Sequence, residues 1–269
     1  MKYRLFISDF DGTLVRADGT VSDYSKQIIK EYRDMGGIFA VCSGRMLGSI
    51  LPRARELGLE GPVVAYQGAV IADVKSGRLL KCDGFSHENA LKVLRILERE
   101  GEHIHLYTAD EFFCNRDDGM LKAYEEICRV KAEVVKEPLS EKLARERLSV
   151  IKILAMLEPQ RRYALKDLLE RELGDGFYVT CSSDWLVEIM PKGQDKASAV
   201  RFLSKHYNVP LEEVAAIGDQ LNDLPMVEAA GGRFAVANAV EELKNIATVA
   251  PSNEEDGVAW VLTKYAIGE

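Results

Sequence analysis

Apolar runs and helical patterns alternate along the first 80 residues of the chain. Continuous apolar runs predict strands at residues 3–8, 38–42 and 63–66. Residues 24–35 carry apolar side chains at helical spacing, and residues 47–57 predict a second helix that ends before Gly58. Strands that are separated by helices in this way predict βαβ units and a parallel sheet.

The pattern changes in the middle of the chain, where several short strands follow one another without a helix between them. Helices are predicted at residues 87–100, 121–128 and 159–173, with a further short helix from Ser140. Strands are predicted at residues 103–108, 112–115, 150–157, 177–181 and 186–190, and a short apolar run occupies 130–135. Neighbouring strands are expected to pair antiparallel, which is typical of an α+β domain.

The βαβ rhythm returns after Lys196, with a helix predicted at 197–207 and strands at 214–217, 234–236 and 248–249. The sequence therefore predicts an α/β fold with a doubly wound, mostly parallel sheet. Residues 1–83 and 190–269 would form this core domain, and residues 84–189 would form an inserted α+β domain. A cleft between two such domains is a common place for a small-molecule site.

The acidic balance of the chain argues against one class of partner. The chain has 269 residues, of which 35 are Lys or Arg and 43 are Asp or Glu, so its formal net charge is -8. A dedicated nucleic-acid binder usually carries a basic face, so we expect no nucleic-acid partner. A phosphorylated substrate stays compatible with this charge, because a local cation can reverse the local field.

The apolar segments and the cysteines indicate a cytoplasmic protein that does not enter a membrane. No apolar stretch approaches the roughly 20 residues of a membrane span. The N-terminus lacks both the long apolar region and the cleavage site of a signal peptide. The five cysteines are odd in number, widely spaced and without a C-x-x-C pair. This pattern is typical of reduced thiols in a cytosol and favours neither a disulfide framework nor a zinc site.

The strongest chemical signal is the segment Asp9-Phe10-Asp11-Gly12-Thr13, which ends the first predicted strand. Ligands of open α/β sheets bind at such strand ends. Two carboxylates that stand two residues apart repel each other unless a cation or a shared proton offsets the repulsion. A hard divalent ion is the obvious partner, and Mg²⁺ is suited to phosphate substrates. A plain Asp/Gly turn at a strand end is the competing interpretation.

Other strand ends supply complementary groups. Ser43-Gly44-Arg45 follows the second predicted strand and offers a hydroxyl, backbone N–H groups and a guanidinium to an anion. The segment Gly218-Asp219-Gln220-Leu221-Asn222-Asp223 follows the strand at 214–217 and adds side chains that suit a metal or a phosphate. Lys196 enters a predicted helix, where its ammonium could shield the carboxylates. Lys192 competes for that role, but the apolar pattern after residue 196 favours Lys196 as the helix-entry residue.

These residues resemble the four motifs of the haloacid dehalogenase superfamily of phosphatases. Asp9-x-Asp11-Gly12-Thr13 matches the first motif, Ser43 the second, Lys196 the third, and Gly218-Asp219-x-x-Asn222-Asp223 the fourth. The insert is similar to the C2B-type cap of subfamily IIB, the Cof-type group. The chain departs from the family's pattern at Gln67, where Asn commonly precedes a Gly, and at Ala197, where Gly is common.

The resemblance implies a mechanism for the matched residues. Asp9 would be the nucleophile that attacks phosphorus and forms an aspartyl-phosphate. Asp11 would protonate the leaving alkoxide and later activate the hydrolytic water. Ser43 and Lys196 would complete the catalytic set by holding the transferring phosphoryl oxygens, and Thr13 would orient the loop.

The resemblance also implies two sets of ligands. Mg²⁺ would be held by the Asp9 carboxylate, the Asp11 backbone carbonyl and the Asp219 carboxylate, with Asn222 and Asp223 helping directly or through water. The expected phosphate-binding residues are Asp9, Ser43, Gly44, Arg45, Lys196 and Asn222.

The activity implied by the resemblance is Mg²⁺-dependent hydrolysis of a small phosphorylated metabolite. A sugar phosphate is the first expectation, because caps of this type often accept one, and a nucleotide, flavin or pyridoxal phosphate stays open. One alternative is a phosphotransferase or phosphomutase that passes the phosphoryl group to a sugar hydroxyl. The other is a non-catalytic sensor of phosphorylated ligands, whose signature would be the loss of Asp9 or Asp11, and both are present.

Two histidines stand apart from these motifs. His103 and His105 are two residues apart on a predicted strand, which suggests a metal pair. We expect no metal there, because no third ligand is near them in the sequence. His103, His105 and Tyr107 are instead expected to share one face of the inserted domain's sheet, where they would contact the substrate if that face covers the cleft.

Overall fold

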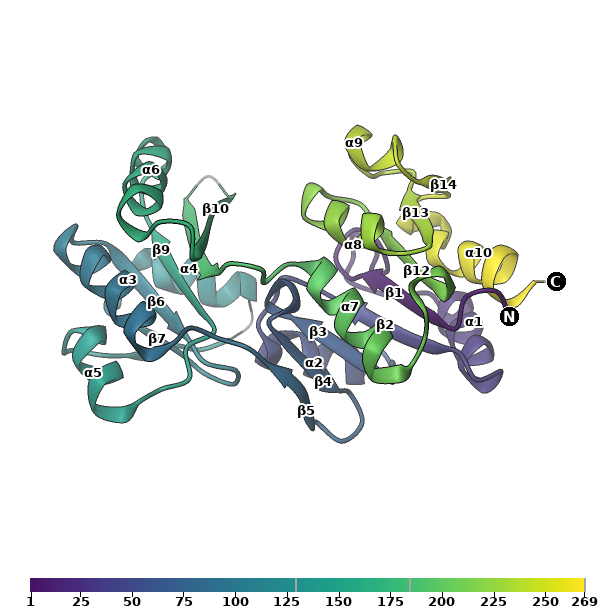
Figure 1. Ribbon diagram of the computed structural model, residues 1–269, viewed down its shortest axis with the longest axis horizontal. Coiled ribbons are helices and arrows are strands. Elements are labelled where there is room, and N and C mark those ends of the chain that lie inside the picture. The colour runs from purple at the N-terminus through teal and green to yellow at the C-terminus, as the bar shows by residue number, and fades with distance from the viewer. Residues whose placement is uncertain (129, 184, 269) are drawn as a thin grey trace. The chain divides into compact units, whose positions relative to one another are not determined.

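The computed structural model describes residues 1–128, 130–183 and 185–268, and these residues form two units. The first unit contains Met1–Arg45, Ile50–Lys81 and the chain from Asp195 onward, and the second contains Met46–Ser49 and Cys82–Gln194. Both ends of the chain therefore belong to the first unit, and the second unit is inserted between them (Figure 1).

Eight described strands form the sheet of the first unit, in the order β14-β13-β12-β1-β2-β3-β4-β5. Their bounds are β1 Leu5–Asp9, β2 Ile38–Cys42, β3 Pro62–Ala65, β4 Val70–Asp73, β5 Leu79–Cys82, β12 Val214–Gly218, β13 Gly232–Val236 and β14 Thr248–Ala250. The pairing is parallel from β14 to β3 and antiparallel between β3 and β4. Every residue of β1 is buried, as expected for a continuous apolar run in a central parallel strand.

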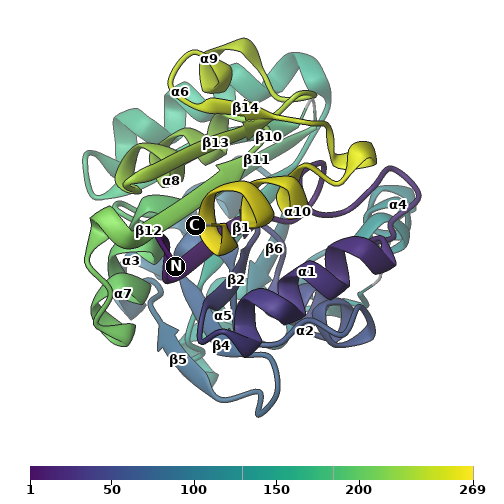
Figure 2. The same ribbon diagram turned by 90° about the vertical axis from the view of Figure 1, so that its right-hand side faces the viewer.

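Helices lie on both faces of this sheet (Figure 2). Their bounds are α1 Asp23–Asp34, α2 Leu47–Glu56, α7 Lys196–Tyr207, α8 Leu224–Ala229, α9 Glu241–Lys244 and α10 Gly257–Val261. Helix α1 packs against α10 on one face, and α7 packs against α8 on the other. The hydroxyl of Ser22 caps α1, whose apolar stripe buries Ile28, Ile29 and Tyr32. The doubly wound, mostly parallel fold is thus confirmed.

A second, mostly antiparallel sheet organises the inserted unit. Its six described strands follow the order β10-β11-β9-β6-β7-β8. Their bounds are β6 His103–Tyr107, β7 Phe112–Cys114, β8 Glu133–Val134, β9 Lys152–Met156, β10 Phe177–Ser183 and β11 Leu186–Pro191. Only the short pair β7–β8 is parallel among these strands.

Three of the described helices pack on one face of this second sheet, and the helix that carries Tyr124 packs on the other face, where Tyr124 contacts His105 and Tyr107. The helices of the unit are α3 His87–Arg99, α4 Gly119–Cys128, α5 Leu139–Glu146 and α6 Arg162–Leu173. Helix α3 contacts α5, α6, β6 and β9, and Ile104 and Leu106 of β6 belong to this apolar core. Because side chains alternate along a strand, His103, His105 and Tyr107 lie on the opposite face of β6. The insert therefore has the predicted α+β character.

Two strands of the first unit, β4 and β5, were not predicted from the sequence. Strand β4 is a short buried run that follows β3 after a tight turn, and β5 is an edge strand whose residues are exposed or half-buried. Short strands joined by a turn leave too few residues for the period of two to stand out. They extend the parallel sheet with an antiparallel edge and do not change the fold class.

Two findings bear on the expected cellular setting. Among the residues that the model describes, no helix is both long and apolar enough to cross a membrane. All five cysteines are free thiols, as expected. Cys42 and Cys114 are buried, whereas Cys82 is exposed.

Candidate active site

Three carboxylates meet at the carboxyl-end edge of the parallel strands. Asp9 is the last residue of β1, and Asp219 and Asp223 follow β12, which lies beside β1 in the sheet. The carboxyl ends of neighbouring parallel strands share one edge, so the fold joins groups that are far apart in sequence. One oxygen of each carboxylate lies within 4.8 Å of the others, and all three residues are buried.

Lys196 supplies a buried ammonium to this cluster. It is the first residue of α7, so the predicted helix-entry position is confirmed. Its Nζ lies 2.5 Å from Asp9 Oδ1 and 2.5 Å from Asp223 Oδ1, and the lysine is only 1% exposed. Lys192, the competing candidate, is exposed. The structure therefore brings Lys196 among the carboxylates.

The loop after β1 holds Asp219 in place. Thr13 is buried, and its Oγ1 donates a hydrogen bond to Asp219 Oδ1 at 2.7 Å. Gly12 has a φ of +80°, and a Cβ there would stand 2.6 Å from Asp219 Oδ2. Both the backbone angle and the close approach require glycine at this position. Asn238, just after β13, donates a hydrogen bond to the Gly12 carbonyl at 2.8 Å and fixes the loop from the other side.

Asp223 is committed to contacts within the cluster. The backbone N–H groups of Asp219 and Gln220 donate to its Oδ2 at 2.9 Å and 3.0 Å. Its Oδ1 accepts the hydrogen bond from Lys196. Both oxygens of Asp223 thus have donors, and the residue ties the loop after β12 to α7.

Burial dominates the electrostatics of the cluster. Burial raises the pKa of Asp9 well above its ordinary value, although Lys196 opposes the rise. Burial also raises the pKa of Asp219, and the hydrogen bond from Thr13 opposes this rise. Burial by itself would lower the pKa of Lys196, but the charges of Asp9 and Asp223 outweigh it and raise that pKa. Lys196 is therefore cationic throughout the neutral range.

The donor set fits a hard divalent cation. Three carboxylates face one ammonium, so the cluster carries an excess of negative charge when all four groups are ionised. Uncompensated charge in a buried place is strongly unfavourable. The available ligand atoms are carboxylate and carbonyl oxygens, which Mg²⁺ prefers. The chemistry of the residues therefore agrees with the Mg²⁺ expected from the sequence.

Asp11 and Arg45 form an ion pair at the same edge of the sheet. Arg45 Nε lies 2.7 Å from Asp11 Oδ2, and its Nη2 lies 2.8 Å from Asp11 Oδ1. This two-point geometry is the strong form of a guanidinium–carboxylate contact. The Asp11 side chain is half-exposed, so it lies outside the buried carboxylate cluster.

Ser43 and Gly44 form the turn after β2, as the sequence indicates. Ser43 is buried, and its Oγ accepts a hydrogen bond from the Arg45 N–H at 3.1 Å. A Cβ on Gly44 would stand 2.5 Å from Gln67 Nε2, so glycine permits a close approach of the next loop. Asn222 is exposed, and its Nδ2 donates to Gln67 Oε1 at 3.3 Å.

The loop after β3 makes contacts with the site that the sequence did not indicate. Tyr66 and Gln67 have φ values of 50° and 56°, a region that side-chain-bearing residues rarely adopt. A Cβ on Gly68 would stand 2.4 Å from the carbonyl of Asp195, the residue before Lys196. Strained backbone of this kind concentrates at functional sites. Apart from the departure at Gln67, nothing in the residue pattern signals this role, because the contacts involved are long-range.

Comparisons with known proteins find a matching family and curated relatives. A family model described as haloacid dehalogenase-like hydrolase matches residues 6–262. The 5-amino-6-(5-phospho-D-ribitylamino)uracil phosphatase YitU of Bacillus subtilis is 29% identical to this chain, over 97% of this chain and 97% of its own length.

Solved structures share the fold. A crystal structure of a Thermotoga maritima protein matches with a TM-score of 0.87 and 32% identity, over 97% of this chain and 96% of that one. A subclass IIB sugar phosphatase of the haloacid dehalogenase superfamily matches with a TM-score of 0.80 over 98% of this chain and 100% of its own. Its identity is 18%, so this second likeness concerns the fold alone.

Proposed function

Because the chain belongs to the haloacid dehalogenase-like hydrolases, we propose that it is a Mg²⁺-dependent phosphatase that acts on a small phosphorylated metabolite. The observation that carries the proposal is the buried cluster of Asp9, Asp219 and Asp223 around Lys196. Phosphoryl transfer depends mainly on positioning and on neutralising charge, and this cluster is built for both. In the proposal the first unit is the catalytic core, and the second is the cap that selects the substrate.

Asp9 is the proposed nucleophile. It stands at the end of a buried strand, and Lys196 holds its Oδ1 at 2.5 Å, so the carboxylate has a fixed direction. Attack by a carboxylate oxygen on phosphorus would form an aspartyl-phosphate and release the alcohol of the substrate. Water would then cleave the acyl phosphate, return the carboxylate and release inorganic phosphate.

Asp11 is the proposed general acid and base. It is half-exposed beside the buried cluster, where it can reach the leaving oxygen of a bound ester. Its ion pair with Arg45 keeps the carboxylate oriented. In this scheme Arg45 shifts toward the substrate phosphate, and Asp11 is then free to take up the proton that it delivers to the leaving alkoxide.

Anion-binding groups surround the place where the phosphoryl group would lie. Ser43 and Lys196 would hold the transferring oxygens, with Gly44, Arg45 and Asn222 contacting the phosphate from the rim. Asp9 and Asp219, with the backbone carbonyl of Asp11, would hold Mg²⁺, which supplies the charge that lets an anionic nucleophile approach an anionic phosphate. Asp223 would mainly position Lys196 and the loop of Asp219, because its oxygens already accept hydrogen bonds.

A sugar phosphate is the first substrate class to test. YitU is named for a phospho-D-ribityl compound, and the subclass IIB structure is titled a sugar phosphatase. Both names place the phosphate on a sugar or on a chain derived from one. We extend this to the present chain as part of the proposal.

The test is phosphate release from a panel of sugar, nucleotide, flavin and pyridoxal phosphates, with Mg²⁺ and with chelator. Asp9→Asn serves as the matched variant, because it keeps the shape of the side chain and removes the nucleophile. We expect release that requires Mg²⁺ and falls at least about 10³-fold in Asp9→Asn. Unchanged turnover in a folded Asp9→Asn protein would remove Asp9 from the mechanism.

Two other outcomes would replace the proposal. Transfer of the phosphoryl group to a second sugar, without net phosphate release, would identify a phosphotransferase. Binding of phosphorylated compounds without any turnover would identify a sensor, despite the presence of Asp9 and Asp11.

A further inference from the structure

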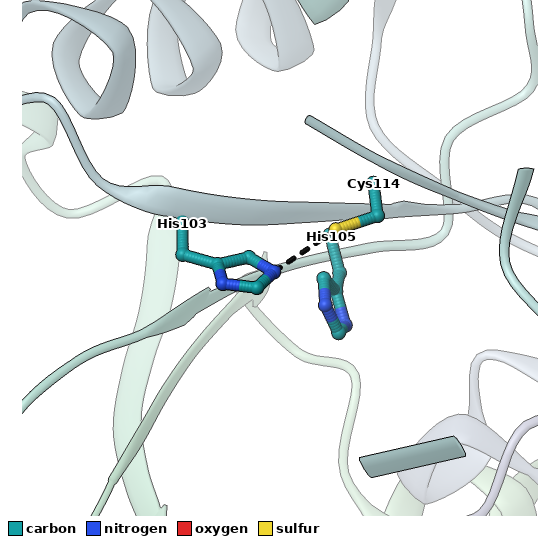
Figure 3. Close-up of side chains that lie close together, drawn as sticks. All are labelled: His103, His105 and Cys114. Carbon is teal, nitrogen blue, oxygen red and sulfur yellow. Dashed lines mark hydrogen bonds between the residues drawn. The ribbon is translucent and has the colours of Figure 1, made fainter. Parts of the chain in front are cut away.

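The polar face of β6 carries a second group of ligand-type side chains, outside the catalytic core. His105 and Cys114 are paired directly across the antiparallel strands β6 and β7, and His103 stands two residues before His105 on the same face. A ring nitrogen of each histidine and the Cys114 sulfur lie within 4.8 Å of one another (Figure 3). The strand pairing therefore supplies a third ligand-type group, Cys114, which is not near the two histidines in the sequence.

We propose that His103, His105 and Cys114 bind a zinc ion within the inserted unit. Two imidazoles and one thiolate are a ligand set that Zn²⁺ prefers, and one that Mg²⁺ and Ca²⁺ do not. Zinc bonds of about 2.0–2.3 Å require ligand atoms about 3–4 Å apart. His103 Nε2 lies 3.0 Å from Cys114 Sγ, which is within this range, and all three ligand atoms lie within 4.8 Å of one another.

The Nδ1 atom of each histidine, which would point away from the ion, lies near an oxygen atom of another side chain. His103 Nδ1 lies 3.2 Å from Asp118 Oδ2 but forms no hydrogen bond with it in this conformation; a carboxylate at this place is common behind metal-bound histidines. His105 Nδ1 lies 3.1 Å from the Tyr107 hydroxyl. That hydroxyl donates a hydrogen bond to the Tyr124 hydroxyl at 2.7 Å, so it accepts one from His105 Nδ1. The Nε2 lone pair of His105 is thus available for an ion. His103 Nε2 donates to Cys114 Sγ, whose own proton goes to the Arg116 carbonyl, so ion binding would also move the His103 ring proton from Nε2 to Nδ1.

The second ring nitrogen of His105, Nε2, lacks a hydrogen-bond partner among the described residues. This atom is buried, and His105 is completely inaccessible to solvent. A buried polar atom without a partner is rare and unfavourable. An ion shared with His103 and Cys114 would satisfy this atom, and it would cross-link β6 to β7.

A nucleophilic thiol is the competing interpretation of part of this cluster. A thiol, an imidazole and a carboxylate stand in a row here, as in a catalytic triad: Cys114 contacts His103, and His103 lies near Asp118. Cys114 and His103 are 0% and 2% exposed, however, so no substrate reaches the sulfur. A triad would also leave His105 without a role. Zinc binding gives a role to His103 Nε2, His105 Nε2 and Cys114 Sγ together.

Binding has a defined proton balance. The Cys114 thiol also donates to the Arg116 carbonyl at 3.1 Å, so in the absence of an ion it is protonated. When Zn²⁺ binds, the S–H bond breaks, a Zn–S bond forms, and one proton leaves to solvent. The two imidazoles bind as neutral ligands through Nε2 and release no proton.

The test uses the full chain without a histidine tag, reduced and treated with chelator, and titrated with Co²⁺ in excess Mg²⁺. We expect a thiolate-to-cobalt charge-transfer band that saturates at a single Co²⁺ per chain and disappears when Zn²⁺ is added. The excess of Mg²⁺ keeps Co²⁺ away from the carboxylates of the core. Absence of a thiolate band in the wild-type protein would overturn the proposal.

Two cysteine variants locate the band. Cys114→Ser should abolish it, and Cys42→Ser should retain it, because Cys42 is the other buried thiol and lies beside Asp9 in the core sheet. Loss of the band in Cys42→Ser together with its survival in Cys114→Ser would contradict the assignment. If Cys114→Ser does not fold, His105→Gln replaces it, and a band of full intensity in that variant would equally overturn the proposal.

Discussion

The pairing of Lys196 with two buried carboxylates makes Lys196→Met the most informative single change. Methionine has about the same length and keeps the apolar part of the side chain, so the change removes mainly the ammonium. Lys196 and Asp223 are each about 1% exposed in their side chains, and both contacts are 2.5 Å long. The variant would leave Asp9 and Asp223 buried without their cation.

The size of the effect follows from the cost of breaking a buried ion pair. Removing one partner of such a pair costs about 3–5 kcal/mol. Domains are stable by about 5–15 kcal/mol, so the Mg²⁺-free variant loses a large part of its stability. Mg²⁺ binds the same cluster and restores positive charge, and at 100 times its Kd a ligand returns about 2.7 kcal/mol. The wild-type protein gains the same stabilisation from Mg²⁺, so the deficit shrinks only as far as the variant, which lacks the competing ammonium, binds Mg²⁺ more tightly; we expect a smaller deficit in saturating Mg²⁺ than in chelator.

The phosphatase activity of Lys196→Met should also fall, for a reason that is independent of stability. Lys196 is proposed to hold a phosphoryl oxygen whose charge grows in the transition state, and loss of one such donor costs about 10²–10³-fold in kcat. The fall should persist in saturating Mg²⁺, where the protein is folded. Urea unfolding with and without Mg²⁺, and phosphate release at saturating substrate, measure the two effects independently.

Lys192→Met is the matched control, because Lys192 is exposed and lies just before α7. It should change the free energy of unfolding by less than about 0.5 kcal/mol, as surface substitutions usually do. The reasoning is refuted if Lys196→Met is as stable as this control without Mg²⁺, or if its deficit is the same at every Mg²⁺ concentration.

Three further predictions concern other parts of the molecule. Asp11→Asn should lower phosphate release by about 10²–10⁴-fold without altering Mg²⁺-dependent stability, and a normal rate would exclude Asp11 as the general acid. Gly12→Ala should destabilise the protein by about 1–3 kcal/mol more than Gly36→Ala in urea unfolding, because both glycines have positive φ but only Gly12 adjoins Asp219; equal losses would contradict the close contact. Burial lowers the pKa of His105 well below its usual value, so the unfolded chain takes up a proton below about pH 6.5 that the folded chain does not. The free energy of unfolding should therefore fall with decreasing pH in this window, by up to about 1.4 kcal/mol per pH unit, and His105→Phe measured in chelator should show a shallower fall.

Sequence spacing was sufficient to predict the groups that cluster at the edge of the first sheet. Asp9 ends an apolar run, and Asp219 and Asp223 follow another, so a parallel pairing of those runs predicts their meeting. Lys196 was chosen over Lys192 from the helical pattern that follows it, and the structure places Lys196 in the cluster. The catalytic roles of these residues stay predictions until the variants are measured.

Other contacts depend on loop conformations that have no sequence signature. The pairing of Arg45 with Asp11 depends on how the turns after β1 and β2 face each other. The left-handed backbone at Tyr66 and Gln67 is imposed by its surroundings, because neither residue favours it. Gln67 thereby reaches Asn222, a contact that residue types and spacing do not encode.

The sequence by itself determined the order of strands and helices, the doubly wound core and the carboxylates at its edge. It could do so because burial imposes periods on the sequence, and because parallel strands place their ends at one edge. Only the tertiary structure decided the register of β6 against β7, which sets Cys114 opposite His105. A shift of one residue would turn that sulfur to the other face of the sheet, so the pairing alone makes the two histidines and the cysteine a possible metal site.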